Sequence, residues 1–111
     1  MQWVISVNSA TMAAGEALGD VGTRLVFENE RVKVWELFLE PGERSARHEH
    51  TRDYLFCVLE GESIDADTDD GETIRIPVEP GTTFFIGRGG IETAVNRSGV
   101  RFREILIELK D

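Results

Sequence analysis

The sequence is poor in cysteine, in basic residues and in long apolar runs, and each shortage excludes something. The single Cys57 cannot form an internal disulfide. No stretch approaches the roughly 18 consecutive apolar residues that indicate a membrane-spanning helix. Lys and Arg number 12 against 21 Asp and Glu, so the formal net charge is −9. Such a charge repels phosphate backbones and anionic lipids, which disfavours nucleic acid and membrane surfaces as partners.

The 111 residues are enough for one hydrophobic core. The first residues, MQWVISV, have no Lys or Arg before their apolar patch, so we expect no secretory signal. The missing signal, together with a single cysteine that has no disulfide partner, predicts a cytoplasmic protein. Residues 1–22 are rich in Ala and Gly and are expected to form an N-terminal arm or a short strand and helix. The main domain is expected over residues 23–111.

From residue 23 onward, short apolar runs alternate with turn residues. The stretch ETIRIPVE places Ile74, Ile76 and Val78 at every second position, which is typical of a half-buried strand. Gly71 follows an aspartate, and Asp-Gly is a strong hairpin signal. Pro77 has no N–H and therefore predicts an edge strand or a ladder position without a hydrogen bond. About seven or eight short strands of this kind predict an all-β sandwich or small barrel. A triplet of alternating aspartates, Asp65, Asp67 and Asp69, imitates a calcium loop but is better explained as a solvated hairpin tip.

Aromatic side chains on strands usually lie in the core. This prediction covers Trp35, Phe38, Phe56, Phe84, Phe85 and Phe102. The strand from Tyr54 to Leu59 is apolar on both faces, so both faces are expected to be covered. One would face the core, and the other a partner or the N-terminal arm.

Both histidines of the chain lie in one stretch, ARHEHTRDYLFCVLEG, at residues 46–61. On a strand, His48 and His50 would project from the same face about 7 Å apart, so both could contact one metal ion. The alternative is a pair of surface histidines at a polar strand end. Tyr54 shares their parity and is expected to point into the same cavity, whereas Asp53 has the opposite parity.

Two stretches resemble the conserved motifs of the cupin superfamily. PGERSARHEHTRDYLFCVLEG resembles the first motif, and GTTFFIGRGGIETAVN resembles the second. The positions in register are Gly42, His48, His50, Gly61, Gly81, Gly89 and Asn96. Within the superfamily, the chain is similar to small single-domain bacterial cupins known as β-alanine degradation proteins. The resemblance implies a cupin-type antiparallel β-barrel, a double-stranded β-helix or jelly roll, over residues 23–111, and a homodimer.

The chain departs from the cupin motifs at three positions. Tyr54 stands where a Glu is usual, Gly87 where Pro is usual, and Glu92 where the last His is usual. The resemblance implies His48 and His50 as metal ligands, and a carboxylate at Glu92 can replace the imidazole as the third ligand. The alternative for Glu92 is a solvated residue at the barrel mouth. Tyr54 has a reference pKa near 10 and is therefore expected to contact the substrate or donate a proton rather than ligate.

Two histidines and one carboxylate suit one divalent metal ion, with iron preferred and manganese, nickel or zinc as alternatives. The leading expectation is an Fe(II) dioxygenase acting on a small oxygenated or carboxylate metabolite, with Tyr54 and Glu92 as catalytic residues. A metal-dependent isomerase or lyase and a non-catalytic ligand-binding cupin remain open as alternatives, because a fold does not choose among them. Arg88, in the loop before Glu92, could bind a substrate carboxylate or could be a surface ion-pair partner.

Overall fold

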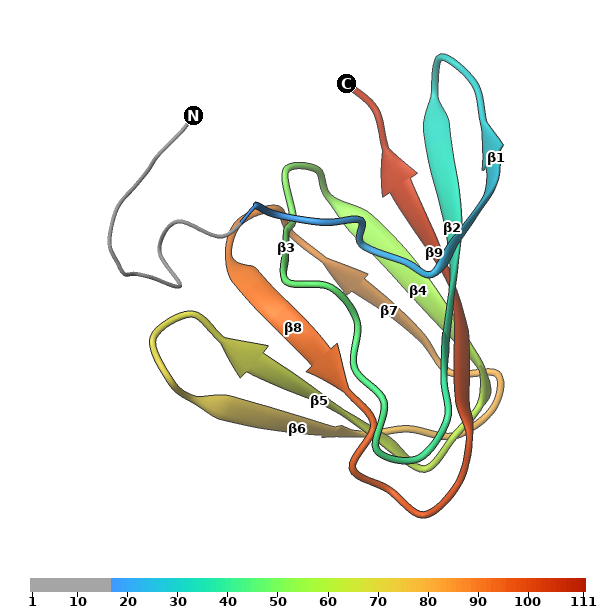
Figure 1. Cartoon of the computed structure of the whole chain (residues 1–111). Coiled ribbons are helices and arrows are strands. Elements are labelled where there is room, and N and C mark those ends of the chain that lie inside the picture. The colour runs from blue at the N-terminus through green and yellow to red at the C-terminus, as the bar shows by residue number, and fades with distance from the viewer. Residues whose placement is uncertain (1–16) are drawn as a thin grey trace.

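A computed structural model describes residues 17–111 of the chain. Over that range it forms nine β-strands and no helix (Figure 1). The strands are β1 (Arg24–Glu28), β2 (Val32–Leu39), β3 (His48–Glu49), β4 (Tyr54–Glu60), β5 (Ser63–Thr68), β6 (Thr73–Pro77), β7 (Thr83–Ile86), β8 (Ile91–Val95) and β9 (Phe102–Leu109). The predicted all-β class is confirmed. The described part of the chain therefore contains no helix that could cross a membrane.

The predicted N-terminal arm is described only in part. Residues 1–16 lie outside the described residues, so the prediction of a strand or helix there is not addressed. Residues 17–22 run without a strand into β1, and the N–H of Gly19 donates a hydrogen bond to the carbonyl of Arg47 at 2.8 Å. Val21 is buried.

The strands form two antiparallel sheets that face each other (Figure 1). The five-stranded sheet has the order β1-β2-β9-β4-β7 and the four-stranded sheet the order β3-β8-β5-β6. Strand β9 lies between β2 and β4, and its pairing with β2 runs without interruption from Leu39 opposite Phe102 to Val32 opposite Leu109. Pro77 ends β6, an edge strand, as its missing N–H predicts.

The hydrophobic core fills the space between the sheets. It includes Trp35, Phe56 and Phe102 from the five-stranded sheet and Ile64 from the four-stranded sheet. The turn after β4 passes directly over Phe102. Gly61 adopts φ +144° there, and a Cβ atom on it would lie 2.8 Å from the Phe102 ring, so this turn needs glycine.

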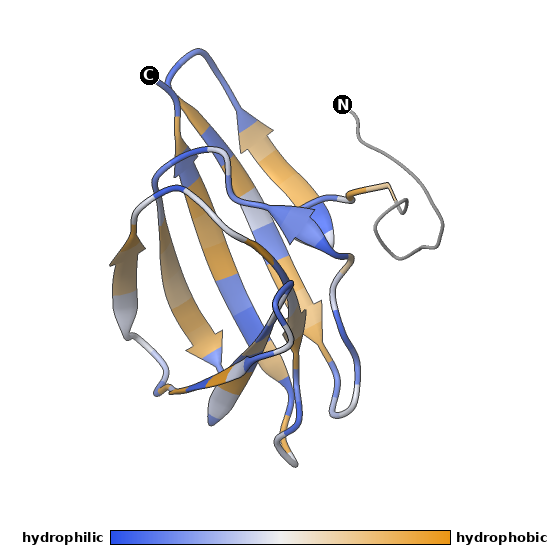
Figure 2. Ribbon diagram, turned by 90° about the vertical axis from the view of Figure 1, so that its left-hand side faces the viewer, coloured by the Kyte–Doolittle hydropathy of each residue, from blue (hydrophilic) through white to orange (hydrophobic). Residues whose placement is uncertain are grey.

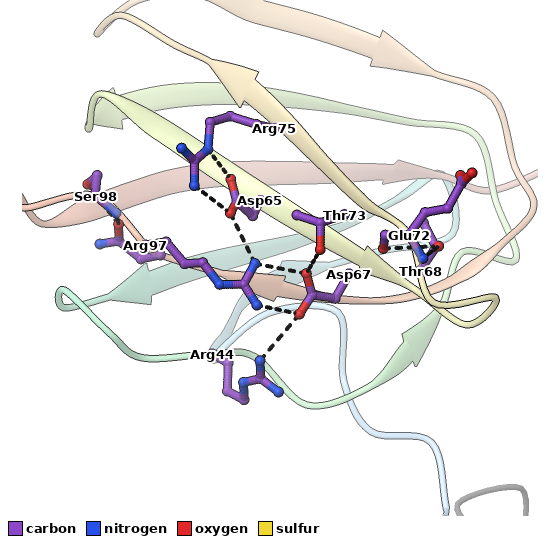
Figure 3. Close-up of polar contacts among 10 residues, drawn as sticks. Arg44, Asp65, Asp67, Thr68, Glu72, Thr73, Arg75, Arg97 and Ser98 are labelled. Atoms are coloured by element: carbon purple, nitrogen blue, oxygen red, sulfur yellow. Dashed lines mark hydrogen bonds and ion pairs between the residues drawn. The ribbon is translucent and has the colours of Figure 1, made fainter.

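The two outer faces differ in chemistry. On the four-stranded sheet, aspartates of β5 and arginines around them form a connected network (Figure 3). The Asp65 carboxylate accepts hydrogen bonds from Arg75 at 2.8 Å and Arg97 at 3.0 Å, and Asp67 is bound by Arg97 and Arg44. Asp65 is 1% exposed, so the expectation of a solvated hairpin tip is wrong for this residue. The arginines neutralise the aspartates that imitate a calcium loop.

The outer face of the five-stranded sheet carries an apolar row, and its strands contain many hydrophobic residues (Figure 2). Directly paired residues share a face, and one such row crosses all five strands. It consists of Phe27, Val34, Ile107, Leu55 and Phe85. Phe27 is 52% exposed and Phe85 is 61% exposed. The prediction that Phe85 lies in the core is wrong, because its pairing with Leu55 places it on this outer row, whereas Trp35, Phe56 and Phe102 are buried as predicted.

Asn96, the last residue of the second motif, joins the loops at one end of the sandwich. Its buried Nδ2 donates to the carbonyl of Leu39 at 2.9 Å and to that of Val100 at 2.8 Å. Its Oδ1 accepts from the N–H of Ser98 at 3.0 Å. One amide group thus satisfies backbone groups of two separate loops.

Replacing Asn96 by Ala should lower the free energy of unfolding by about 2–3 kcal/mol, since it removes the side-chain donor of the Leu39 carbonyl and one of the two side-chain donors of the Val100 carbonyl. The measurement is urea denaturation followed by fluorescence. Asn29→Ala is the matched control, because the Asn29 side chain accepts hydrogen bonds in an exposed turn, and its loss should cost less than about 1 kcal/mol. Equal losses in both variants would contradict the structural role assigned to Asn96.

Candidate metal centre

A cavity of about 150 Å³ opens between the two sheets. Its wall on the five-stranded sheet includes Leu37, Tyr54, Phe56, Glu104 and Leu106. The four-stranded sheet and the adjoining segments contribute His48, His50, Ile64, Glu92 and Ala94, among others. Val21 also lines the cavity, so the segment before β1 takes part in its wall. All four residues predicted for the site, His48, His50, Tyr54 and Glu92, therefore line one cavity.

The short strand β3 places His48 directly opposite Glu92 of β8. Paired residues of an antiparallel sheet share a face, so both side chains point into the cavity. His50 follows β3 at the same parity, and its ring meets that of His48 edge to face, with centroids 4.8 Å apart. Both histidines are buried, which excludes the alternative of two surface histidines.

The Nε2 atoms of both histidines face the Glu92 carboxylate. His48 Nδ1 lies 2.8 Å from the carbonyl of Ala46, which can only accept, so Nδ1 carries the proton and Nε2 keeps a free lone pair. The Glu92 Oε2 lies 3.3 Å from His50 Nε2 and 3.9 Å from His48 Nε2. The three potential ligand atoms lie within 4.8 Å of one another.

The electrostatics of the cluster suit metal binding. Burial lowers the pKa of His48, which keeps this imidazole neutral. The hydrogen bond from His50 lowers the pKa of Glu92, which keeps this carboxylate ionised. Neutral imidazole and ionised carboxylate are the forms that bind a divalent ion. The donor set, its spacing and the backbone hydrogen bond that orients His48 all fit such an ion.

Tyr54 forms the wall next to His50. Its ring stacks on the imidazole with centroids 4.2 Å apart and an interplanar angle of 14°. Burial raises the pKa of Tyr54 well above its usual value, so the phenol keeps its proton. Tyr54 therefore lines the cavity as a hydrogen-bond donor beside the metal cluster, the placement that its strand parity predicts.

Asp53 and Arg88 lie away from the cavity lining. The Asp53 carboxylate accepts the backbone N–H of Arg88 at 2.8 Å and its Nε at 3.2 Å. Arg88 also binds the Asp111 side chain at 3.0 Å. Of the two interpretations of Arg88, the structure shows the surface ion pair, and the opposite parity predicted for Asp53 is observed.

The sequence analysis missed Glu104. This residue of β9 is 4% exposed and lines the cavity. Burial, with a smaller effect of the negative charge of Glu92, raises the pKa of Glu104 to about 8. The pattern FREILIEL has apolar residues at both parities, so it does not reveal which set faces inward. The sequence did contain one signal for the burial of Glu104. It lies two residues after Phe102, which was predicted to be in the core, and residues two apart on a strand share a face.

Comparison with known proteins supports the cupin fold. No family model and no curated protein matches the sequence. Among solved structures, a cupin-domain protein of Bordetella pertussis has 25% identity and a TM-score of 0.70, and the match covers 84% of this chain and 100% of that one. A cupin superfamily protein of Desulfitobacterium hafniense has 18% identity and a TM-score of 0.59, with 85% and 84% covered.

A third similar structure is a polyketide cyclase of Streptomyces resistomycificus, with 26% identity and a TM-score of 0.56. That match covers 75% of this chain and 57% of the cyclase, so the chain spans little more than half of that protein. The neighbours and the two antiparallel sheets together confirm the cupin-type fold that the two motifs predict.

The buried carboxyl of Glu104 should make stability depend on pH. Its pKa is near 8 in the folded chain against an ordinary value of 4.5, so between these pH values the folded state holds a proton that the unfolded chain has released. The contribution of the Glu104 proton to the free energy of unfolding is therefore fully present at low pH. It is lost as the pH rises towards 8, by at most about 1.4 kcal/mol per pH unit.

Glu104→Gln removes this titration while keeping the shape of the side chain. At pH 8 the variant should be more stable than the parent by on the order of 2–4 kcal/mol, and the gain should shrink towards pH 5. Thermal unfolding in the presence of a chelator measures both proteins across that range. A difference between them that stays constant with pH would contradict the burial of an acid at this position.

Proposed function

We propose that this cupin is a metal-dependent enzyme that acts on a small oxygenated metabolite. The observation that carries the proposal is the convergence of the ligand atoms of His48, His50 and Glu92 in one cavity. Three ligands from the protein are the number found in catalytic metal sites, which keep coordination positions for substrate. A structural site would have its full set of protein ligands.

Each residue of the site has a chemical task. His48, His50 and Glu92 would hold one divalent ion, which supplies Lewis acidity and, in the case of iron, the capacity to activate dioxygen. Tyr54, kept protonated by burial, orients the substrate or donates a proton to it from the wall beside His50. The apolar side chains of Phe56, Ile64 and Leu106 exclude water from the inner part of the cavity.

Oxidative cleavage with Fe(II) is the leading reaction. Two histidines and one carboxylate with open positions form the ligand set of non-haem Fe(II) oxygenases. Manganese, nickel and zinc accept the same donors, and affinity alone favours nickel and zinc, but not manganese, over iron. The ligand set thus supports iron through its geometry and its open positions.

A non-oxidative reaction is the second candidate. The similar structure of a polyketide cyclase indicates that a related chain performs a reaction named for ring closure. For such a reaction His48 and His50 would hold the ion, which would supply Lewis acidity, and Glu92, free of the ion, would serve as a base. An isomerase or lyase would use the same residues.

Metal content tests the ligands directly. The protein, produced without a His tag, should contain about one divalent ion per chain, and His48→Ala and His50→Ala should lose nearly all of it. Glu92→Ala should bind less metal, whereas Tyr54→Phe should retain it. Glu49→Ala is the matched control, because Glu49 lies between the histidines but is exposed, and it should bind metal normally.

Elemental analysis of the dialysed proteins gives the result. Loss of metal in Tyr54→Phe together with full occupancy in Glu92→Ala would mean that Tyr54, not Glu92, is the third ligand.

Oxygen uptake distinguishes the reactions. The iron-loaded protein should consume dioxygen with a subset of small diketones, thiols or hydroxy compounds, and Tyr54→Phe should reduce the rate about 10²- to 10⁴-fold if Tyr54 transfers a proton. Product formation without oxygen consumption would select the isomerase or lyase. Tight binding of a metabolite by metal-free protein, with no turnover under any loading, would select a ligand-binding protein and overturn the proposal of an enzyme.

A second copy of the chain is the proposed cover of the apolar outer row. The row ends in an exposed phenylalanine on each side, so a two-fold rotation brings Phe27 of one copy onto Phe85 of the other. The charged residues that share this face in paired register are two acids and two bases, Glu36, Glu60, Arg24 and Arg103. Two copies with a net charge of −9 each can therefore approach here with little repulsion.

Phe85→Lys should shift the protein from dimer to monomer at micromolar concentration, because it places a charge against Phe27 of the second copy within the apolar contact. Val100→Lys, which changes an exposed apolar residue in the loop before β9, is the control and should remain dimeric. Light scattering measures the mass of each protein. A monomeric parent protein would contradict the proposal.

A further inference from the structure

Glu104 is a buried acid without a partner. It lies on β9 opposite Leu37 of β2 and Val58 of β4, both buried, and its own side chain lines the cavity. Among the described residues, no hydrogen bond or ion pair to its carboxyl group is present. The one side-chain polar atom of this part of the chain that is sealed off without a partner is His50 Nδ1, so the Glu104 oxygens keep access to the cavity.

The other buried acids of the described chain each have a partner. Glu36 is bound by Arg24 and Arg103, and Asp65 by Arg75 and Arg97. Glu108, on the same face of β9, accepts a hydrogen bond from the indole of Trp35 at 2.9 Å. Burying an unpartnered carboxyl group costs stability, and a ligand that hydrogen-bonds to it offsets that cost. This contrast indicates that the partner of Glu104 comes from outside the chain.

The Glu104 carboxyl group is neutral at neutral pH. Burying a charge without a counter-charge costs far more than burying the protonated form. Burial accordingly raises the pKa of Glu104 to about 8. A protonated carboxyl group carries an O–H donor, and no acceptor for it is present among residues 17–111. The missing partner of Glu104 is therefore a hydrogen-bond acceptor.

The other titratable groups around the cavity leave this donor role to Glu104. On the five-stranded sheet, Tyr54 pairs with Glu108, four residues along β9 from Glu104, and its ring lies against His50. Its phenol is thus a separate donor beside the metal cluster. From the opposite sheet and the segments next to it, the titratable residues that line the cavity are His48, His50, Asp65 and Glu92. Within the described chain, no Lys or Arg lines it.

The rest of the wall limits the size and polarity of the ligand. Leu37 and Leu106 lie next to Glu104 on the same face of the sheet and are apolar. A cavity of about 150 Å³ accommodates a molecule of roughly the size of benzene. Ile74 and Ile86 also line it, on the edge strands β6 and β7, yet they are 50% and 37% exposed. The cavity therefore opens between these two strands, where a larger apolar group can extend.

We propose that Glu104 is a positioning residue that donates a hydrogen bond from its carboxyl group to an acceptor oxygen, of the carbonyl type, on a small and otherwise apolar ligand. The inference rests on the proposed function only in so far as this cavity is the substrate site. It narrows the substrate class, because the substrate then carries an acceptor oxygen in addition to the group that reacts beside Tyr54 and the metal cluster.

Acetophenone and ethylbenzene are suitable probes, because they share a phenyl ring and the carbonyl oxygen of acetophenone can only accept. Ligand-observed NMR on the full, chelator-treated chain at pH 7 gives the ratio of their affinities. Glu104→Leu should lower the ratio of acetophenone to ethylbenzene affinity at least about tenfold, since the carbonyl loses its donor. Glu104→Gln keeps an N–H donor and should retain the ratio within about threefold. Glu108→Gln changes a partnered acid on the same strand and should also retain it.

The same titrations at pH 9.5 identify the donor. The parent should lose about tenfold in the ratio between pH 7 and pH 9.5, because an ionised Glu104 cannot donate. The ratio in Glu104→Gln should not change over this range, since an amide does not titrate there. This comparison needs only the parent and Glu104→Gln, so it decides the question even if Glu104→Leu does not fold.

Three results would overturn the inference. The first is an equal ratio in the parent and in folded Glu104→Leu at pH 7. The second is a ratio that is constant with pH in the parent, or that falls equally in Glu104→Gln. The third is the absence of acetophenone binding to the parent at millimolar concentration. Because these measurements use metal-free protein, failure of the proposed metal enzyme would leave their outcome unchanged.

Discussion

The register of β9 between β2 and β4 is the constraint on which the rest of the structure depends. Successive side chains of a strand alternate between faces, so this register sends Phe102, Glu104 and Leu106 inward and Ile107 outward. A slip of one residue would exchange the two sets. The same pairing thus closes the core, places an acid in the cavity and forms the centre of the apolar outer row.

Much of the fold follows from the sequence, because turn and edge residues act locally. The Asp-Gly turn, the edge proline Pro77 and the period-two strands need only short-range chemistry, and the cupin-type fold is confirmed. The shared face of His48 and His50 is also local. The similarity to β-alanine degradation proteins stays a prediction.

What the sequence could not determine depends on long-range pairing. In FREILIEL and in the strand that contains Phe85, apolar residues occupy both parities, so only the partner strand decides which set is buried. Asp65 is the opposite case, a residue that was expected to be exposed but is buried. Its charge indicates exposure, but Arg75 and Arg97 from distant positions cover it. For Arg88 the sequence allows two roles, and the choice depends on Asp53 and Asp111.

The segment before β1 contributes to the wall of the cavity. The Gly19 N–H binds the carbonyl of Arg47, next to His48, and Val21 lines the cavity itself. At Gly22 a Cβ atom would lie 2.7 Å from that of Trp35, so the segment can follow this close path only with glycine there. A chain shortened to the predicted domain boundary at residue 23 would keep all nine strands. It would nonetheless lack Val21, and with it part of the cavity wall.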